Sequence, residues 1–244
     1  MNRQPLHQYD IIEFSTLKTR CAYLHDRQMK MEYKFIKNCP PHINEKLVKR
    51  GWRRFGHYFS RPKCENCNEC KSLRIDVKNF KPTRSQRRVF KQKGINFIIK
   101  KPSVTKEHLT LYEKYHRHMQ KRRGWDYYSV NEDSYTDLYI KGFSSYGKEI
   151  QYYYKKRVVA VDLVDFLDDG ISANYFYYDP DLAKLSLGVY SLLVQIELAK
   201  KKGLLWIYPG YFVKDCQSLN YKASYRPHQV LRNLPEFDEK PIWL

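Results

Sequence analysis

The chain has 244 residues and a formal net charge of +19 at pH 7. This length is enough to bury a substantial hydrophobic core. No apolar run approaches the roughly 18 residues that a membrane-spanning helix needs, and the first ten residues lack the apolar stretch of a secretory signal. We therefore expect a cytoplasmic protein without membrane partners, whose six cysteines are thiols or metal ligands and not disulfides.

The charge is unevenly distributed along the chain. Residues 1–122 hold 30 Lys and Arg against 10 Asp and Glu, whereas residues 123–244 hold 15 against 16. A basic excess confined to one half favours a surface that binds a polyanion, most commonly nucleic acid. Solubility is the alternative explanation, but it would not require the charge to be segregated.

The first half of the chain predicts short alternating elements. In order they are a helix over 43–51, a strand in WRRFGHYF (52–59), a strand over 72–80, a basic helix over 83–94 and a strand over 95–100. A longer helix follows over 105–122. In it Leu109, Tyr112, Tyr115 and Met119 recur at helical spacing, so we expect them to face a core.

The second half has a different order of elements. It predicts strands over 149–156 and 157–166, an Asp-Gly hairpin turn at 168–170, a strand over 171–180, a helix over 185–203, a buried strand over 204–212 and a helix over 212–225. A strand–helix–strand step implies a right-handed parallel crossover in a mixed sheet. This is the order of the acyltransferase fold that N-acetyltransferases use.

These patterns predict an α+β protein with two domains. Residues 1–102 would form a smaller, basic, cysteine-containing α+β domain. Residues 103–244 would form a GNAT-like acyltransferase domain, in which helices flank a mixed sheet. Because one fold serves many functions, the function has to come from particular residues.

Three cysteines recur at a spacing of three residues in RPKCENCNEC (61–70). Each CxxC pair can chelate one metal ion, and a tetrahedral site needs a fourth ligand. The preferred set is Cys21, Cys64, Cys67 and Cys70, with Cys39, His25 and His57 as alternative fourth ligands. Zinc and an iron–sulfur cluster both accept such ligands. Reduced thiols with a structural or redox-sensitive role are the competing interpretation.

The segment DPDLAKLSLG (179–188) leads from a strand into the start of a helix. Ser186 could cap that helix, and Gly188 would let a ligand approach the backbone. Free N–H groups at a helix start bind an anion or a developing oxyanion. A coenzyme A pyrophosphate site is normally richer in glycine, so a simple capped helix start is an equally good interpretation. The chain has no GxSxG or HExxH motif of a hydrolase.

Several stretches occur in an order that resembles the aminoacyl-tRNA–protein transferases. They are GWRRFG (51–56), RPxCxxCxxC (61–70), SLRIDV (72–77), YFYYDPD (175–181), SLGVYSLL (186–193), PGYF (209–212) and CxxxxYK (216–222). The resemblance covers about residues 20–231. It is closest to the short bacterial branch, which moves leucine from leucyl-tRNA onto proteins beginning with Asp or Glu and marks them for degradation through the N-degron pathway.

Three other functions remain open at this point. An arginyl-tRNA–protein transferase would match the eukaryotic relatives. An acyl-coenzyme A N-acetyltransferase would match the fold but would not explain the basic half. A metal-stabilised RNA-binding module without chemistry would explain residues 1–122 but leave the second half without a role.

The resemblance implies an acyl transfer in which the acceptor's α-amine attacks the ester carbon of the aminoacyl-tRNA. An α-amino group has a pKa of about 8, so part of it is neutral near pH 7. The enzyme therefore has to position the reactants and stabilise an oxyanion, and no cofactor is required. Asp179 and Tyr221 would orient the amine, with Ser186 and Gly188 near the oxyanion.

The resemblance also implies three binding surfaces. Arginine and lysine suit an acidic N-terminal side chain, and because Arg53 and Arg54 alternate on a strand, we expect only one of them to face the site. The candidates are Arg53, Arg54 and Lys222 for that side chain; Tyr175, Tyr177 and Leu187 for the leucyl group; and Arg84, Arg87, Arg88, Lys91 and Lys93 for the tRNA.

Overall fold

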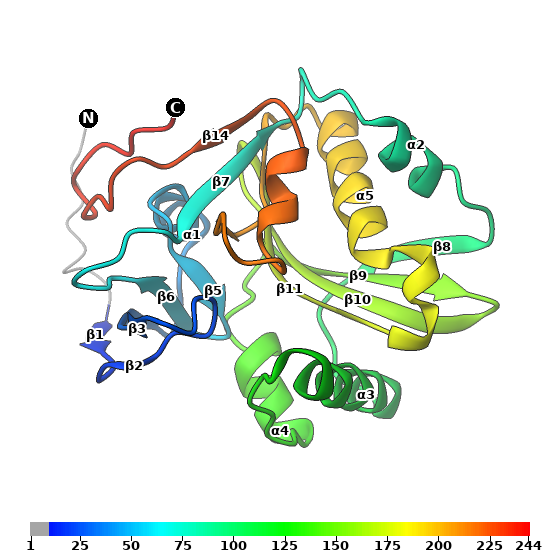
Figure 1. Ribbon diagram of the computed structural model, residues 1–244, viewed down its shortest axis with the longest axis horizontal. Coiled ribbons are helices and arrows are strands. Elements are labelled where there is room, and N and C mark those ends of the chain that lie inside the picture. Colours follow the sequence, from blue (N-terminus) through cyan, green and yellow to red (C-terminus); the bar gives the residue numbers. More distant parts are fainter. Residues whose placement is uncertain (1–9) are drawn as a thin grey trace.

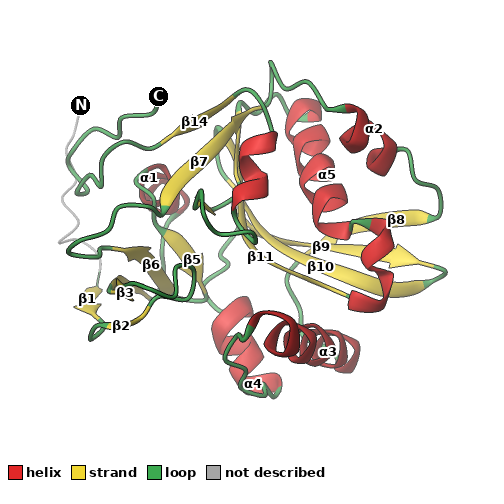
Figure 2. Cartoon of the chain, viewed as in Figure 1, coloured by secondary structure: helices red, strands yellow, loops and turns green. Residues whose placement is uncertain are grey.

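The computed structural model describes residues 10–244, so the expectation about the first nine residues lies outside it. The described chain forms a small four-stranded sheet and a large eight-stranded mixed sheet. Figure 1 shows the small sheet beside one end of the large one, and Figure 2 shows helices on both sides of the large sheet. None of the described helices is long and apolar enough to cross a membrane. The predicted α+β class, with helices flanking a mixed sheet, is confirmed.

The small sheet comes entirely from the N-terminal part of the chain. Its antiparallel order is β1 (Ile11–Ser15), β4 (Met31–Ile36), β6 (Tyr58–Pro62) and β5 (Arg53–Phe55). The strand predicted in WRRFGHYF is thus a hairpin that turns at Gly56. A Cβ at Gly56 would lie 2.2 Å from the carbonyl oxygen of Asp137 and φ is +57°, so only glycine fits this turn.

Two further elements complete this part of the chain. Helix α1 (Pro41–Lys49) matches the helix predicted from residue 43 and ends just before Gly51. A two-stranded ribbon of β2 (Thr19–Arg20) and β3 (Gln28–Met29) precedes the cysteine segment (61–70) in the sequence. The pattern of the sequence indicated neither this ribbon nor strands β1 and β4, because their residues are mixed polar and half-exposed.

The large sheet contains the predicted crossover. Its order is β13 (Tyr211–Phe212), β7 (Lys71–Asp76), β12 (Trp206–Tyr208), β11 (Gly170–Tyr178), β10 (Arg157–Phe166), β9 (Gly147–Tyr154) and β8 (Ile95–Lys100). The eighth strand, β14 (His228–Val230), lies outside this order and also pairs with β7. Strands β11 and β12 are parallel and joined by helix α5 (Leu187–Lys201), whereas the other pairs are antiparallel. The parallel crossover is therefore confirmed.

Helices cover the two faces of the large sheet. Helices α2 (Arg84–Phe90) and α5 lie on one face, and α3 (Lys106–Arg123), α4 (Glu132–Tyr135) and the π-helical turn Thr136–Ile140 lie on the other. Helix α3 buries Tyr112, Tyr115 and Met119 as predicted, while Leu109 is half-buried. Two separate apolar cores result, one on each side of the sheet.

Two predictions for the C-terminal part are wrong. The strand expected over 204–212 is interrupted at Pro209–Gly210, and both of its halves, β12 and β13, pair with β7. The helix expected over 212–225 is only a 3₁₀ turn at Asn220–Ser224. The pairing of β13 with β7 holds the start of this segment extended, so a continuous helix cannot form there.

The large sheet crosses the predicted domain boundary. Strands β7 and β8 precede residue 103, yet both are strands of the sheet that the second half builds. The division at residue 102 stays a prediction. Both parts of the chain supply strands to one sheet.

A buried ion pair joins the small sheet to the large one. Arg54 on β5 donates two hydrogen bonds to Asp165 on β10, from Nε to Oδ2 at 2.8 Å and from Nη2 to Oδ1 at 2.6 Å. Asn44 on α1 donates to the same carboxylate at 3.1 Å. Arg54 is 5% exposed and Asp165 is fully buried. Arg54 was expected to bind a substrate carboxylate; in the structure its partner is instead a carboxylate of the protein, which points to a structural role.

Removing one member of this pair should destabilise the protein. Arg54→Ala leaves the Asp165 carboxylate buried without its cation, and we expect the free energy of unfolding to fall by about 3–5 kcal/mol. Urea unfolding measures this change. The double variant Arg54→Met/Asp165→Leu removes both charges and should recover much of the loss. A single variant of wild-type stability that had lost only its transfer activity would contradict the structural role.

Candidate functional site

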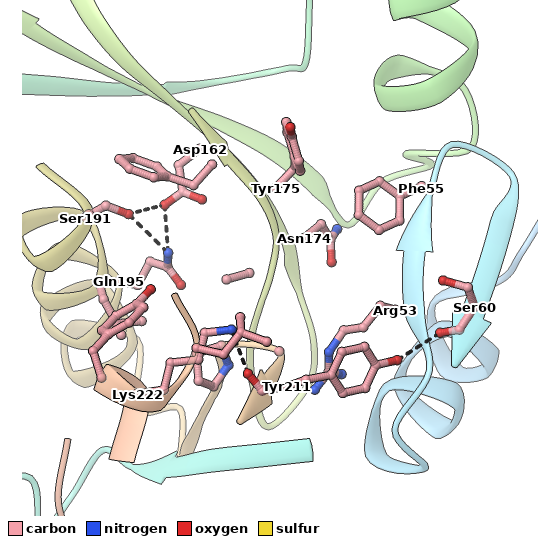
Figure 3. A pocket seen from close by; sticks show the side chains of 18 of the residues that line it. Arg53, Phe55, Ser60, Asp162, Asn174, Tyr175, Ser191, Gln195, Tyr211 and Lys222 are labelled. Atoms are coloured by element: carbon pink, nitrogen blue, oxygen red, sulfur yellow. Dashed lines mark hydrogen bonds between the residues drawn. The ribbon is translucent and has the colours of Figure 1, made fainter. Parts of the chain in front are cut away.

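A cavity of about 380 Å³ lies where the two sheets meet (Figure 3). Strands β5, β6, β10 and β11, helix α5 and the segment 209–222 line it. Of the residues predicted for substrate binding or catalysis, five line this cavity: Arg53, Tyr175, Gly188, Tyr221 and Lys222. We call it the acceptor cavity.

One wall of the acceptor cavity carries two buried cations. Arg53 is 4% exposed and donates from Nη1 to the carbonyl of Trp52 at 3.0 Å, while its Nε and Nη2 are buried without a hydrogen-bond partner. Lys222 is 8% exposed and donates to the carbonyl of Tyr211 at 2.9 Å. Neither side chain forms an ion pair within residues 10–244. Buried, unpaired donors of this kind fit an anionic ligand.

The proximity of the two cations changes the titration of Lys222. Burial, and then the charge of Arg53, lowers the pKa of Lys222 to about 7. Gly210 permits this approach, because a Cβ there would lie 3.3 Å from the Lys222 ammonium and 3.8 Å from Arg53 Nε. Its φ of +94° also favours glycine. The PGYF stretch therefore provides the bend that brings Lys222 next to Arg53.

The opposite wall carries a carboxylate that the sequence analysis did not select. Asp162 on β10 is fully buried; its Oδ2 accepts hydrogen bonds from Ser191 Oγ and from Gln195 Nε2, the latter at 2.7 Å. Its Oδ1 and Gln195 Oε1 are buried without partners. Burial raises the pKa of Asp162 to about 6, although the two hydrogen bonds oppose the shift. A carboxylate with such a pKa is mostly ionised at pH 7 and can accept a proton.

An amide completes the polar lining. Asn174 on β11 accepts a hydrogen bond from Ser172 at 3.2 Å, while its Nδ2 is buried without a partner. Figure 3 shows Asn174 between Asp162 and Arg53. The cavity thus holds unpartnered donors on one side and unpartnered acceptors on the other.

Asp179 and Ser186 do not line the acceptor cavity. Asp179 caps the 3₁₀ turn Pro180–Leu185, and its Oδ1 pairs with Lys114 at 2.5 Å. Ser186 has φ 49° and makes no side-chain cap on α5, so the predicted cap is wrong. It borders a second, neighbouring cavity. In the structure Asp179 caps a turn and pairs with Lys114, and the carboxylate that lines the acceptor cavity is that of Asp162.

The residues expected around the leucyl group are divided between the cavity and the core. Tyr175 lines the acceptor cavity, with its ring 5.9 Å from that of Phe55. Tyr177 is fully buried and shares a 2.6 Å hydrogen bond with Tyr135. Leu187 is 2% exposed in the core beneath α5 and borders only the second cavity. Tyr177 is therefore a core residue and not part of the cavity.

The residues predicted for tRNA are all exposed on or just after helix α2. They are Arg84, Arg87, Arg88, Lys91 and Lys93. The end of α2 lies beside the start of α5, because Gln92 donates a hydrogen bond to the carbonyl of Leu185 at 3.1 Å. Their role in tRNA binding stays a prediction.

The four predicted metal ligands lie near one another but do not form a ligand set. Burial, and then the charges of Cys21, Cys64 and Cys67, raises the pKa of Cys70 to about 12. The Sγ of Cys67 accepts a hydrogen bond from Arg27 at 3.2 Å. Within residues 10–244, no group of three His, Cys, Asp or Glu side chains is arranged to hold a metal ion. The metal site stays a prediction, and no chemistry below depends on it.

Comparison with known proteins gives matches over nearly the whole chain. Models described as "Arginine-tRNA-protein transferase, N terminus" and "Arginine-tRNA-protein transferase, C terminus" match residues 19–88 and 107–232. An aspartate/glutamate leucyltransferase of Campylobacter jejuni is 49% identical, over 95% of this chain and 98% of the relative. Proteins of the same name in Helicobacter hepaticus (96% of this chain, 97% of the relative) and Pseudomonas fluorescens (90% and 93%) are 41% and 33% identical.

Solved structures resemble this one more distantly. The structure of L-PGS from Bacillus licheniformis has a TM-score of 0.45 and 13% identity, over 68% of this chain and 49% of that one. A GCN5-related glucosamine N-acetyltransferase region in a fungal GH3 enzyme has a TM-score of 0.43 and 13% identity, over 78% of this chain and 21% of that one.

The family models and the relatives define the class of protein. The sequence matches make the class specific: the protein is an aminoacyltransferase that acts on an aminoacyl-tRNA and a protein. The chain belongs to the arginine-tRNA-protein transferase family. The resemblance drawn from the motifs is confirmed.

The pKa of Asp162 predicts how the transfer rate depends on pH. If Asp162 accepts the proton of the attacking amine, Asp162→Asn should lower kcat on the order of 100-fold. The fall in rate of the wild type below about pH 6 should also disappear in this variant. Steady-state kinetics between pH 5 and 8 measure both effects, with the exposed Asp133→Asn as control. An unchanged acid limb in Asp162→Asn would exclude this residue as the base.

Elemental analysis tests the cysteine segment. If Cys21, Cys64, Cys67 and Cys70 bind zinc or an iron–sulfur cluster, protein purified without oxygen should contain stoichiometric metal, or show the absorption bands of a cluster. Cys67→Ser should abolish that content. A fully folded wild-type protein without metal would remove the hypothesis.

Proposed function

We propose that this enzyme transfers leucine from leucyl-tRNA to the N-terminal α-amine of proteins that begin with Asp or Glu. The observation that carries this proposal is that the acceptor cavity has a cationic wall and an acidic wall: Arg53 and Lys222 face Asp162 across it. An N-terminal Asp or Glu has an α-amine and a carboxylate a few bonds apart. Each group therefore meets a wall of complementary charge.

The cationic wall selects the acidic side chain. Arg53 offers a pair of unpartnered N–H groups, the geometry that binds a carboxylate through two hydrogen bonds. Lys222 adds a point charge, and the Nδ2 of Asn174 adds a neutral donor. A neutral N-terminal side chain would leave these buried donors unpaired, which costs binding energy. Proteins that begin with a neutral residue are therefore poor acceptors.

The acidic wall orients and deprotonates the amine. Asp162 Oδ1 and Gln195 Oε1 are both free to accept its hydrogen bonds. As the amine nitrogen attacks the ester carbon, Asp162 takes its proton; the carbon–oxygen bond to the tRNA ribose then breaks, and Asp162 returns the proton to the leaving ribose oxygen, which becomes a hydroxyl. Tyr221 lines the same cavity, and its phenol is protonated near pH 7 and able to donate a hydrogen bond to that oxygen.

The rest of the cavity suits an apolar aminoacyl group. Phe176, Leu192 and Leu219 line it together with Tyr175. A transferred arginine would bring a third cation next to Arg53 and Lys222, which favours leucine over arginine. No cofactor is needed, because the ester is already activated. A cytoplasmic location and a role in marking proteins for degradation are part of this proposal.

One assay compares the candidate functions. The protein is incubated with labelled leucyl-tRNA, arginyl-tRNA or acetyl-coenzyme A and with peptides that begin with Asp, Glu, Lys or Ala. We expect transfer of leucine alone, to the Asp and Glu peptides alone. Transfer from arginyl-tRNA or acetyl-coenzyme A, or transfer to the Ala peptide at an equal rate, would overturn the proposal.

Two variants test the cationic wall. Arg53→Met and Lys222→Met should each raise KM for the Asp peptide at least tenfold, because each removes a charge that binds its carboxylate. In the wild type, kcat/KM for this peptide should bend downwards as pH rises through about 7 and Lys222 loses its charge; Lys222→Met should lack that bend. Exposed Lys214→Met is the matched control. An identical pH profile in Lys222→Met and the wild type would contradict the assignment.

A further inference from the structure

A second cavity, of about 470 Å³, adjoins the acceptor cavity on the side of helix α3. The two cavities share five lining residues: Tyr23, Phe176, Gly188, Leu219 and Tyr221. The function proposed above assigns no ligand to this second space. Its size is that of a pocket for a small organic molecule or a nucleoside.

Aromatic rings form the walls of the second cavity. Tyr115, Trp125, Phe176 and Tyr178 line it, together with Tyr221. The rings of Phe176 and Tyr178 are stacked with centroids 5.8 Å apart, and Tyr115 packs against Tyr178 at 5.2 Å. Trp125 is half-buried and contacts Tyr115 by its edge at 6.4 Å. Such a group of partly exposed rings fits a flat, unpaired base.

Two arginines at the end of helix α3 border the same space. Arg122 and Arg123 belong to its last turn, and neither forms an ion pair in the described part of the chain. The Nε of Arg123 is buried without a hydrogen-bond partner. The start of α5 also borders the cavity at Ser186, which provides no side-chain cap for the N–H groups of the first turn. These donors fit phosphate oxygens next to a base.

We propose that the second cavity binds the unpaired 3′-terminal nucleotide of the aminoacyl-tRNA. The proposal rests on the function proposed above. The reacting ester joins the aminoacyl group directly to the terminal ribose, so the nucleoside has to lie in a space adjoining the acceptor cavity. Gly188 stands where the two cavities meet, and a Cβ there would come within 3.6 Å of the Phe176 ring. The ester would lie at this junction.

The surroundings give the remaining nucleotides a path. Gln92, just after helix α2, donates a hydrogen bond to Leu185, one residue before Ser186, and its neighbours Lys91 and Lys93 are exposed cations near this end of α5. The acceptor cavity is left free for the peptide and the aminoacyl group. The stacked rings carry the affinity for the base, and the arginines carry the affinity for the backbone.

A binding experiment tests the proposal separately from catalysis. The probe is a CCA trinucleotide that carries leucine through a stable amide at its 3′ end. Its Kd is measured by fluorescence anisotropy for the wild type, Trp125→Ala, Trp125→Phe and Arg123→Ala. We expect Trp125→Ala and Arg123→Ala each to weaken binding about tenfold, and Trp125→Phe to keep most of the affinity, because its ring still stacks. Exposed Arg232→Ala removes the same charge elsewhere and should bind like the wild type.

The outcomes separate the two proposals. Wild-type protein that transfers leucine while both alanine variants bind the probe with unchanged Kd would overturn the assignment of the second cavity and leave the proposed function intact. Failure of the wild type to bind the probe while it transfers leucine from leucyl-tRNA would also overturn the assignment of the second cavity, whereas failure to use any aminoacyl-tRNA would overturn the proposed function itself. Thermal melting of each variant shows whether a loss of affinity comes from unfolding. A loss in Trp125→Ala that Trp125→Phe restores, with equal melting temperatures, supports stacking on this ring.

Discussion

The guanidinium of Arg54 forms a buried ion pair with the carboxylate of Asp165, where the small sheet meets the large one. The acceptor cavity depends on this ion pair. Neighbouring residues of a strand point to opposite faces, so the fixed direction of Arg54 sets that of Arg53 towards the cavity. On the large sheet, Asp165 and Asp162 lie on one strand, and Asp162 faces helix α5. The ion pair therefore fixes one point of contact between the strands that carry the two charged walls.

The cavity keeps polar atoms unsatisfied inside the protein. Buried donors on Arg53 and Asn174, and buried acceptors on Asp162 and Gln195, have no partner within the described chain. Each such atom opposes folding, because water no longer solvates it. The well-packed cores on both sides of the sheet offset this cost. The same atoms need little rearrangement when a ligand of matching charge arrives, which is the basis of preorganised catalysis.

Periodicity predicted the large elements because their packing is regular. Helix α3 buries residues at helical spacing, whereas helix α5 and strand β10 are long apolar runs that are buried almost without interruption. The segment 212–225 was predicted wrongly, because its conformation depends on pairing with β7, a strand far away in sequence. Strands β1 and β4 are likewise held by pairing, β4 with both β1 and β6, and the sequence analysis did not select them.

The site was partly predictable for a related reason. Arg53, Lys222 and Tyr221 belong to motifs, and the structure brings them together. Asp162 does not stand out within VVAVDLVDF, because the sequence does not tell which of its two carboxylates, Asp162 or Asp165, faces the cavity. Asp179 lies in a more conspicuous motif, but it caps a turn and pairs with Lys114. The sequence did not indicate which of Arg53 and Arg54 would form an ion pair inside the protein. That choice depends on Asp165, which lies more than a hundred residues further along the chain.

Strand β7 has a consequence for how the chain is made. All of its partners, β12, β13 and β14, lie in the last part of the sequence, after residue 205. During synthesis this strand therefore leaves the ribosome long before any of them exists. Strand β7 therefore stays without its pairing partners until nearly the whole protein has been translated. The last step of folding then joins the first and last thirds of the chain, and the acceptor cavity, which takes residues from both, is complete only at the end.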